Sequence, residues 1–109
     1  MTRPMFIYKL IPARPTFPAD ITEAEMGIMR QHAAYWTGLL EQGHAIVFGQ
    51  VREPAGSWGL AVVEADSSEQ VESFGIDDPA VINGLGVVEV HPMPVGAARP
   101  HQATRGRPA

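Results

Sequence analysis

The chain has 109 residues, a length typical of one domain, and its 12 acidic and 8 basic side chains give a formal net charge of −4. This charge repels phosphate backbones, so we expect no nucleic-acid partner. The absence of cysteine excludes disulfide frameworks, thiolate metal sites and cysteine nucleophiles. The N-terminus reaches Lys9 before an apolar signal core is complete, and no apolar run approaches the length of a membrane span. We therefore expect a soluble, cytoplasmic protein that contacts no membrane.

The N-terminal part of the chain predicts a strand followed by a long helix. Residues 5–11 are rich in aromatic and β-branched side chains and are closed by Pro12, which suits the end of a strand. Thr22 and Glu25 have the spacing of a capping box, and Gly43 is a natural C-terminal stop. Apolar residues recur three and four positions apart between them, namely Met26, Met29, Ala33, Trp36 and Leu40. This stripe is expected to face a sheet.

The second half of the chain predicts a hairpin, a short helix and a last strand. In order, these are a strand at residues 45–51, a Pro/Gly turn at 52–56, a strand at 58–64, a helix at 67–75 and a strand at 86–91. The complete order is β-α-β-β-α-β, which predicts a ferredoxin-like α+β fold. In this fold two helices cover one face of a four-stranded antiparallel sheet.

The second face of this sheet also needs a cover. Apolar residues occupy both faces of the central strands, with Phe6, Tyr8 and Leu10 alternating with Met5, Ile7 and Ile11, and Trp58, Leu60 and Val62 alternating with Ala61 and Val63. Because no helix remains to cover the second face, we predict a homodimer whose two sheets face each other, which could associate further. We assign residues 1–94 to the domain and 95–109 to a flexible C-terminal tail. The alternative is that residues 94–109 fold back over the open face.

Several short motifs resemble the YCII-related (YciI-like) family. They are Arg30-Gln31-His32, Gly43 eleven residues later, Gly49 at the end of the second strand, Asp78-Pro79, Gly84 and Val90-His91-Pro92. The resemblance implies a dimeric α/β barrel with a pocket in each protomer that contains His32 and Asp78. Two positions depart from the pattern: Gln50 stands where proline often follows Gly49, and Ala80 stands where an aromatic residue often follows Asp-Pro. The second departure leaves the substrate class open.

His32 and Asp78 are the candidate catalytic residues. At about 100° per residue, His32 lies roughly 80° from the centre of the apolar stripe, where a side chain can reach both a pocket and solvent. Histidine side chains exchange protons near neutral pH, and a carboxylate can orient the ring and stabilise its charged form. Two structural alternatives remain. His32 can make an ordinary structural hydrogen bond, and Asp78 can cap a helical turn that begins at Pro79.

Tyr35 and Arg30 are the candidate substrate-binding residues. Tyr35 follows His32 by three positions, so its hydroxyl would lie near the pocket and donate to a substrate oxygen; the alternative is an ordinary half-buried tyrosine. Arg30 faces elsewhere on the helix and would bind an anionic substrate only if a loop folds over it; otherwise it pairs with a surface carboxylate. The other histidines lack the spacing of metal ligands, and no phosphate-binding motif occurs, so we predict no metal and no cofactor.

Two functional hypotheses follow, and the first rests mainly on the family resemblance. In the first, the protein is a cofactor-free enzyme in which His32, oriented by Asp78, moves a proton on a small cyclic or aromatic-derived organic substrate. The reaction would be of the lyase, dehalogenase or isomerase type. In the second, the protein is a non-catalytic module that binds a small hydrophobic molecule and signals to a partner. The fold by itself does not choose between them.

Overall fold

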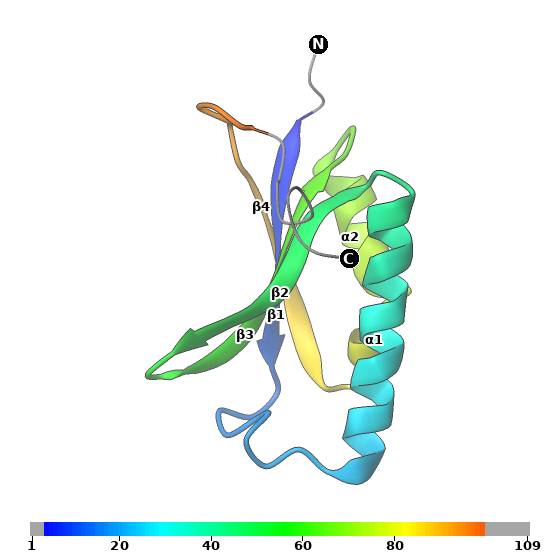
Figure 1. The fold of residues 1–109 in the computed structure, drawn as a ribbon, viewed down its shortest axis with the longest axis vertical. Helices are drawn as coiled ribbons and strands as arrows, with labels where there is room; N and C mark the ends of the chain where they lie inside the picture. Colours follow the sequence, from blue (N-terminus) through cyan, green and yellow to red (C-terminus); the bar gives the residue numbers. More distant parts are fainter. Residues whose placement is uncertain (1–3, 100–109) are drawn as a thin grey trace, which may run out of the picture.

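The computed structural model describes residues 4–99 as an α+β fold with one four-stranded antiparallel sheet. Its elements are β1 (Met5–Pro12), α1 (Glu23–Glu41), β2 (Ala45–Glu53), β3 (Gly56–Glu64), α2 (Ser68–Ile76), α3 (Pro79–Ile82) and β4 (Gly86–Pro92). The strand order is β2-β3-β1-β4, and the helices lie on one face of the sheet (Figure 1). This is the ferredoxin-like arrangement that the sequence predicts.

The hairpin is longer and its turn tighter than the sequence predicts. Glu53 pairs with Gly56, so the connection between β2 and β3 contracts to two residues. Gly56 has a φ of 145°, a conformation that glycine adopts without the steric cost of a Cβ atom. The sequence also left α3 only as an alternative, and this helix is present with Pro79 at its first position.

Helix α1 begins as expected but is rotated relative to the predicted apolar stripe. Thr22 and Glu25 form the capping box, with hydrogen bonds of 3.1 and 2.9 Å between each side chain and the backbone N–H of the other residue. Trp36 and Leu39 are buried, whereas two members of the predicted stripe are substantially exposed, Met26 at 42% and Leu40 at 41%. The buried face therefore lies closer to His32 than predicted. The helix turns so that the indole ring, its largest side chain, enters the core.

The core fills the layer between the helices and the sheet. Its buried members include Phe6, Tyr8 and Leu10 of β1, Ala61 and Val63 of β3, and Val71 and Phe74 of α2. The ring centroids of Tyr8 and Trp36 are 4.5 Å apart, and Phe74 packs edge-on against the same indole at 6.3 Å. These aromatic contacts fix α1 against the centre of the sheet.

The other face of the sheet, which we call the open face, is apolar in its central strands except at Lys9 and Glu64. The strand registers place on it Met5, Ile7, Lys9 and Ile11 of β1, Val47 and Val51 of β2, Trp58, Leu60, Val62 and Glu64 of β3, and Val87, Glu89 and His91 of β4. Its apolar centre in β1 and β3 is half-buried, and the Lys9 ammonium lies 4.7 Å from the centroid of the Trp58 ring. The edge strand β4 adds a carboxylate and an imidazole.

The predicted C-terminal tail falls mostly outside the described residues. Residues 95–99 form neither helix nor strand, and residues 100–109 lie beyond the described range, as does most of the segment in the fold-back alternative. Among residues 4–99, no helix is both long and apolar enough to cross a membrane, and no three histidine or acidic side chains gather as a metal site would require.

Candidate active site

Asp78 is the centre of a buried hydrogen-bond network. Its side chain is 0% exposed and stands at the N-terminus of α3. Oδ1 accepts a hydrogen bond from the Ala80 N–H at 2.9 Å and lies 2.8 Å from Nδ1 of His32. Oδ2 accepts from the Tyr8 hydroxyl and from the Trp36 indole N–H, each at 2.9 Å. Four groups from β1, α1 and the start of α3 therefore surround one carboxylate.

Local sequence explains how each member reaches this network. Asp78 adopts an extended conformation as the N-cap of α3, and the following Pro79 has no N–H to satisfy. His32 and Trp36 are four residues apart on α1, so both point toward Asp78 from the same side of the helix. The helix-cap alternative for Asp78 is thus correct, and the cap coexists with the contact to His32.

The network keeps Asp78 ionised. Burial alone would raise the pKa of Asp78, but the hydrogen bonds from His32 and Trp36, the charge of His32 and the Ala80 N–H together lower that pKa below its ordinary value. Burial, followed by the charge and hydrogen bond of Asp78, raises the pKa of Tyr8, so its hydroxyl stays a donor. An ionised carboxylate only accepts hydrogen bonds, so the shared proton belongs on Nδ1 of His32, and Nε2 is the nitrogen left for chemistry.

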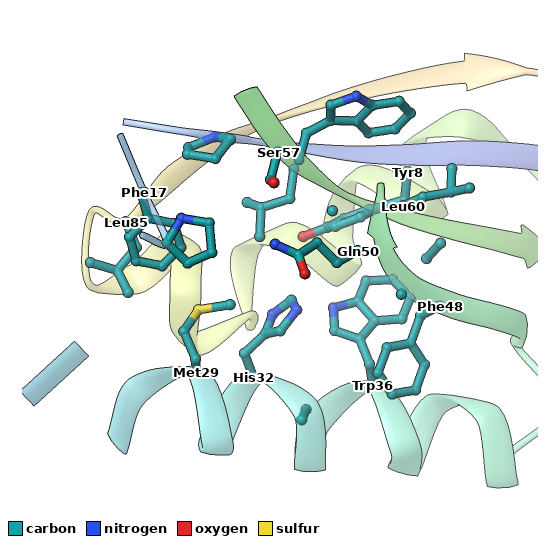
Figure 2. A pocket seen from close by; sticks show the side chains of 18 of the residues that line it. Tyr8, Phe17, Met29, His32, Trp36, Phe48, Gln50, Ser57, Leu60 and Leu85 are labelled. Carbon is teal, nitrogen blue, oxygen red and sulfur yellow. The ribbon is translucent and has the colours of Figure 1, made fainter. Parts of the chain in front are cut away.

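A cavity of about 320 Å³ lies on the other side of His32. It is bounded by α1, by β2 and β3, by Pro12 at the end of β1, and by the segment of residues 13–21 that follows β1 (Figure 2). Most of its lining residues are apolar, including Leu10, Phe17, Met29, Trp36, Phe48 and Leu85. Tyr8, His32 and Trp36 also line the cavity, and their polar atoms contact Asp78. The other polar lining residues include Gln50 and Ser57. Its volume lies at the lower end of the roughly 300–1,000 Å³ of small-molecule sites.

The segment after β1, which we call the strap (residues 13–21), is held against α1 by Arg14. The guanidinium of Arg14 makes two hydrogen bonds of 2.7 Å to the Glu25 carboxylate and further bonds to Asp20. Phe17 of the strap is buried, and Pro18 and Ile21 join it in lining the cavity. One wall of the cavity therefore depends on this ion-pair cluster.

The structure brings His32 and Asp78 together but leaves Tyr35 and Arg30 away from the cavity. The Tyr35 hydroxyl donates to the Phe74 carbonyl at 2.6 Å, and burial, with the charges of Asp77 and Asp78, raises the pKa of Tyr35 to about 12. Arg30 is exposed, and neither residue lines the cavity. Met29 and Ala33 line the cavity on one side of His32, whereas Tyr35 lies on the other side of α1, which packs against α2. Arg30 faces solvent.

Sequence reasoning missed four side chains of the site. Trp36 was assigned only to the core, although its position four residues after His32 was a usable signal. Tyr8, Gln50 and Ser57 come from three strands whose pairing brings them together, and no local motif marks them.

Together, the fold and the site define a ferredoxin-like α+β domain with a histidine–carboxylate pair behind an apolar cavity. Residues 5–94 match the YCII-related domain, and the chain belongs to this family. The structure is similar to 5-chloro-2-hydroxyhydroquinone dehydrochlorinase (TftG) from Burkholderia phenoliruptrix AC1100, solved in complex with 2,5-dihydroxybenzoquinone. The TM-score is 0.64 at 19% identity, and the match covers 84% of this chain and 95% of that chain. At this identity the likeness shows a shared fold. A comparison with curated proteins gave no match.

Proposed function

We propose that the protein is an acid–base enzyme that acts on a small cyclic or aromatic-derived organic compound, in a reaction of the lyase, dehalogenase or isomerase type. One observation carries this proposal: the imidazole of His32 connects a buried carboxylate to an apolar cavity. Nδ1 lies 2.8 Å from Asp78 Oδ1, and the same ring lines the cavity. A base oriented in this way is the basic requirement for proton transfer to or from a bound ligand.

The geometry suggests how a dehydrohalogenation would proceed. In the keto tautomer of the ring, the halide-bearing carbon is tetrahedral and carries a hydrogen. Nε2 of His32 takes the proton of a ring hydroxyl, the O–H electron pair forms a carbonyl, the adjacent C=C pair shifts toward the halide-bearing carbon, and the halide leaves with its bonding pair. The resulting imidazolium is stabilised by Asp78 and returns the proton to water, so the net change is loss of one hydrogen halide. The step consumes no oxidant and no reductant, and these side chains can carry it without a cofactor.

The comparison with solved structures supports this choice of chemistry. The similar dehydrochlorinase is named for a small chlorinated ring that carries hydroxyl groups. The cavity of this chain is lined by aromatic side chains suited to a flat ring, and its volume suits a single ring more than a large ligand.

The test is turnover of 5-chloro-2-hydroxyhydroquinone, followed by chloride release. His32→Ala is expected to lower kcat by at least 100-fold, since a positioned acid–base group contributes roughly 10²–10⁴. The matched control is Gln31→Ala, which changes the exposed neighbouring residue of the same helix. Full chloride release by the folded His32→Ala protein would sink the proposal.

A second candidate is a non-catalytic binding module, and the apolar character of the cavity is the observation that favours it. An apolar cavity holds a hydrophobic ligand by burial alone, whether or not a proton moves. This candidate predicts saturable ligand binding that survives His32→Ala, with no ligand consumed. It fails if the bound ring compound is turned over in a His32-dependent manner.

We further propose that two copies associate through their open faces. The half-buried side chains of Ile7, Leu60 and Val62 form an apolar centre that none of the described helices covers (Figure 1). Val62→Glu is expected to shift the protein from dimer to monomer in sedimentation velocity, because it places a charge at that centre. Ala24→Glu, on the exposed side of α1, should leave the dimer intact. A monomeric wild-type protein at high micromolar concentration would contradict this arrangement.

A further inference from the structure

Gln50 is a polar side chain of the cavity that the proton-transfer step does not use. It lies on β2, where it pairs with Gly59 of β3, and Gly59 in turn pairs with Leu10 of β1. Since Leu10 points into the core, this register places Gln50 on the helix side of the sheet. Gln50 is exposed and also lines the cavity, so it stands at the mouth.

The strand pairing gives the Gln50 side chain room to reach across the cavity. Gly59, its partner in the register, contributes no side chain, and a Cβ atom added there would come within 3.3 Å of Leu10. Figure 2 shows the Gln50 amide directed toward the His32 imidazole, from the opposite wall. A ligand between the two walls would therefore meet a different polar group on each side.

The Gln50 amide has most of its hydrogen-bonding capacity unused. Among the hydrogen bonds of residues 4–99, its side chain takes part in one, in which Oε1 accepts from Nε of exposed Arg52 at 3.4 Å. That distance is at the weak end of the range for such bonds, and the amide NH₂ group retains two donors. Phe17, Trp36 and Phe48 surround the remaining space with aromatic rings.

We propose that Gln50 determines substrate specificity by hydrogen-bonding a polar substituent on the edge of a ring substrate remote from His32. The selected substrate class is a flat, mostly apolar ring that carries an oxygen or nitrogen substituent at each of two separated edges. This inference rests on the proposed function, because it takes the His32 end of the cavity as the reactive end. A site built to hydrogen-bond a substituent discriminates against analogues that lack it. At an exposed mouth this discrimination amounts to about fivefold to tenfold in affinity.

The experiment compares two probes that differ at one edge of the ring. Dissociation constants are measured by isothermal titration for phenol, with one hydroxyl group, and hydroquinone, with a second hydroxyl at the opposite edge. The wild-type protein is expected to prefer hydroquinone by about fivefold to tenfold. Gln50→Leu should abolish the preference while leaving phenol affinity within about twofold, since it removes the amide at similar size. Gln50→Met is a second apolar variant, and Ser57→Ala tests the other polar side chain of the same wall.

Each outcome decides the matter. Loss of the preference in Gln50→Leu and Gln50→Met, with its retention in Ser57→Ala, supports the assignment. A preference that survives both Gln50 variants, one that depends on Ser57 alone, or a wild-type protein that binds the two phenols equally or not at all overturns it. The proposed function is judged separately by chloride release: if His32→Ala abolishes release while the Gln50 variants keep the preference, only this inference fails. If release persists in His32→Ala while the preference disappears in the Gln50 variants, only the proposed function fails.

Discussion

Replacing Asp78 by asparagine tests the buried network with a change of almost no volume. Asparagine is as good an N-cap as aspartate, so α3 is expected to persist. In the native protein, Oδ1 faces the Ala80 N–H and His32, and Oδ2 faces the Trp36 indole N–H and the Tyr8 hydroxyl. The imidazole and the hydroxyl can reverse their roles and accept, but the Ala80 and Trp36 N–H groups can only donate. If the new NH₂ group takes the place of Oδ1, the Ala80 N–H loses its acceptor. If it takes the place of Oδ2, the Trp36 N–H loses its acceptor.

The size of the effect follows from that orphaned donor. A buried donor left without a partner costs about 1–3 kcal/mol, and bonds to a charged acceptor are stronger than bonds to an amide. We expect the free energy of unfolding at pH 7 to fall by about 2–3 kcal/mol, a large share of the roughly 5–15 kcal/mol of a domain. The pKa of Asp78 is lowered in the folded state, so its contribution to stability is present above its ordinary pKa and is lost as the pH falls through the folded value. The difference between the two proteins should therefore shrink in acid.

Urea unfolding followed by tryptophan fluorescence measures the change at pH 7 and again near pH 3. Asp77→Asn is the matched control, because Asp77 is the exposed preceding residue and should cost less than about 0.5 kcal/mol. If Asp78→Asn is no more destabilising than Asp77→Asn at pH 7, the four-donor network does not contribute to stability as described. A difference that grows toward pH 3 would refute the assignment of an ionised Asp78.

Three further predictions address the strap and two glycines. Arg14 lowers the pKa of Glu25 from 4.5 to about 2, so the contribution of this pair is complete above pH 4.5 and is lost as the pH falls toward 2. Glu25→Gln keeps the capping box and should make the free energy of unfolding depend less on pH between 4.5 and about 2. An unchanged pH dependence over this range would contradict the pairing. Gly38→Ala should raise the free energy of unfolding by about 0.5–1 kcal/mol, because the added Cβ meets nothing within 4 Å in α1; a loss of stability in urea would show an unrecognised contact. Gly86→Ala should instead destabilise, since its Cβ would lie 2.6 Å from the Ile11 carbonyl oxygen, and an unchanged urea midpoint would refute that approach.

The sequence predicted an element boundary well where interactions between neighbouring residues set that boundary. The Thr22–Glu25 capping box placed the start of α1, because its hydrogen bonds join residues three apart. The predicted hairpin was too short, since the Pro54 and Gly56 signals mark a turn but not how far the strands pair beside it. The rotation of α1 was wrong because periodicity weighs all apolar residues alike, whereas burial of the Trp36 ring and its bond to Asp78 decides the angle.

The order β-α-β-β-α-β, the identity of the family and the pairing of His32 with Asp78 were therefore within reach of the sequence. The first depends on capping and alternation, which act between neighbouring residues, and the other two came from motifs whose spacing resembles the family. The roles of His32 and Asp78 remain a proposal.

Only the tertiary structure decided what surrounds that pair. Tyr8 and Asp78 are 70 residues apart, and they meet because β1 lies in the centre of the sheet beneath α1. Gln50 and Ser57 reach the cavity through the register of β2 and β3, and a shift of one residue in either strand would send the side chain of that strand to the open face. Tyr35 lies outside the cavity because its side of α1 packs against α2. Which side chains meet depends on packing between elements, and that packing is set by the whole core rather than by any one segment of the sequence.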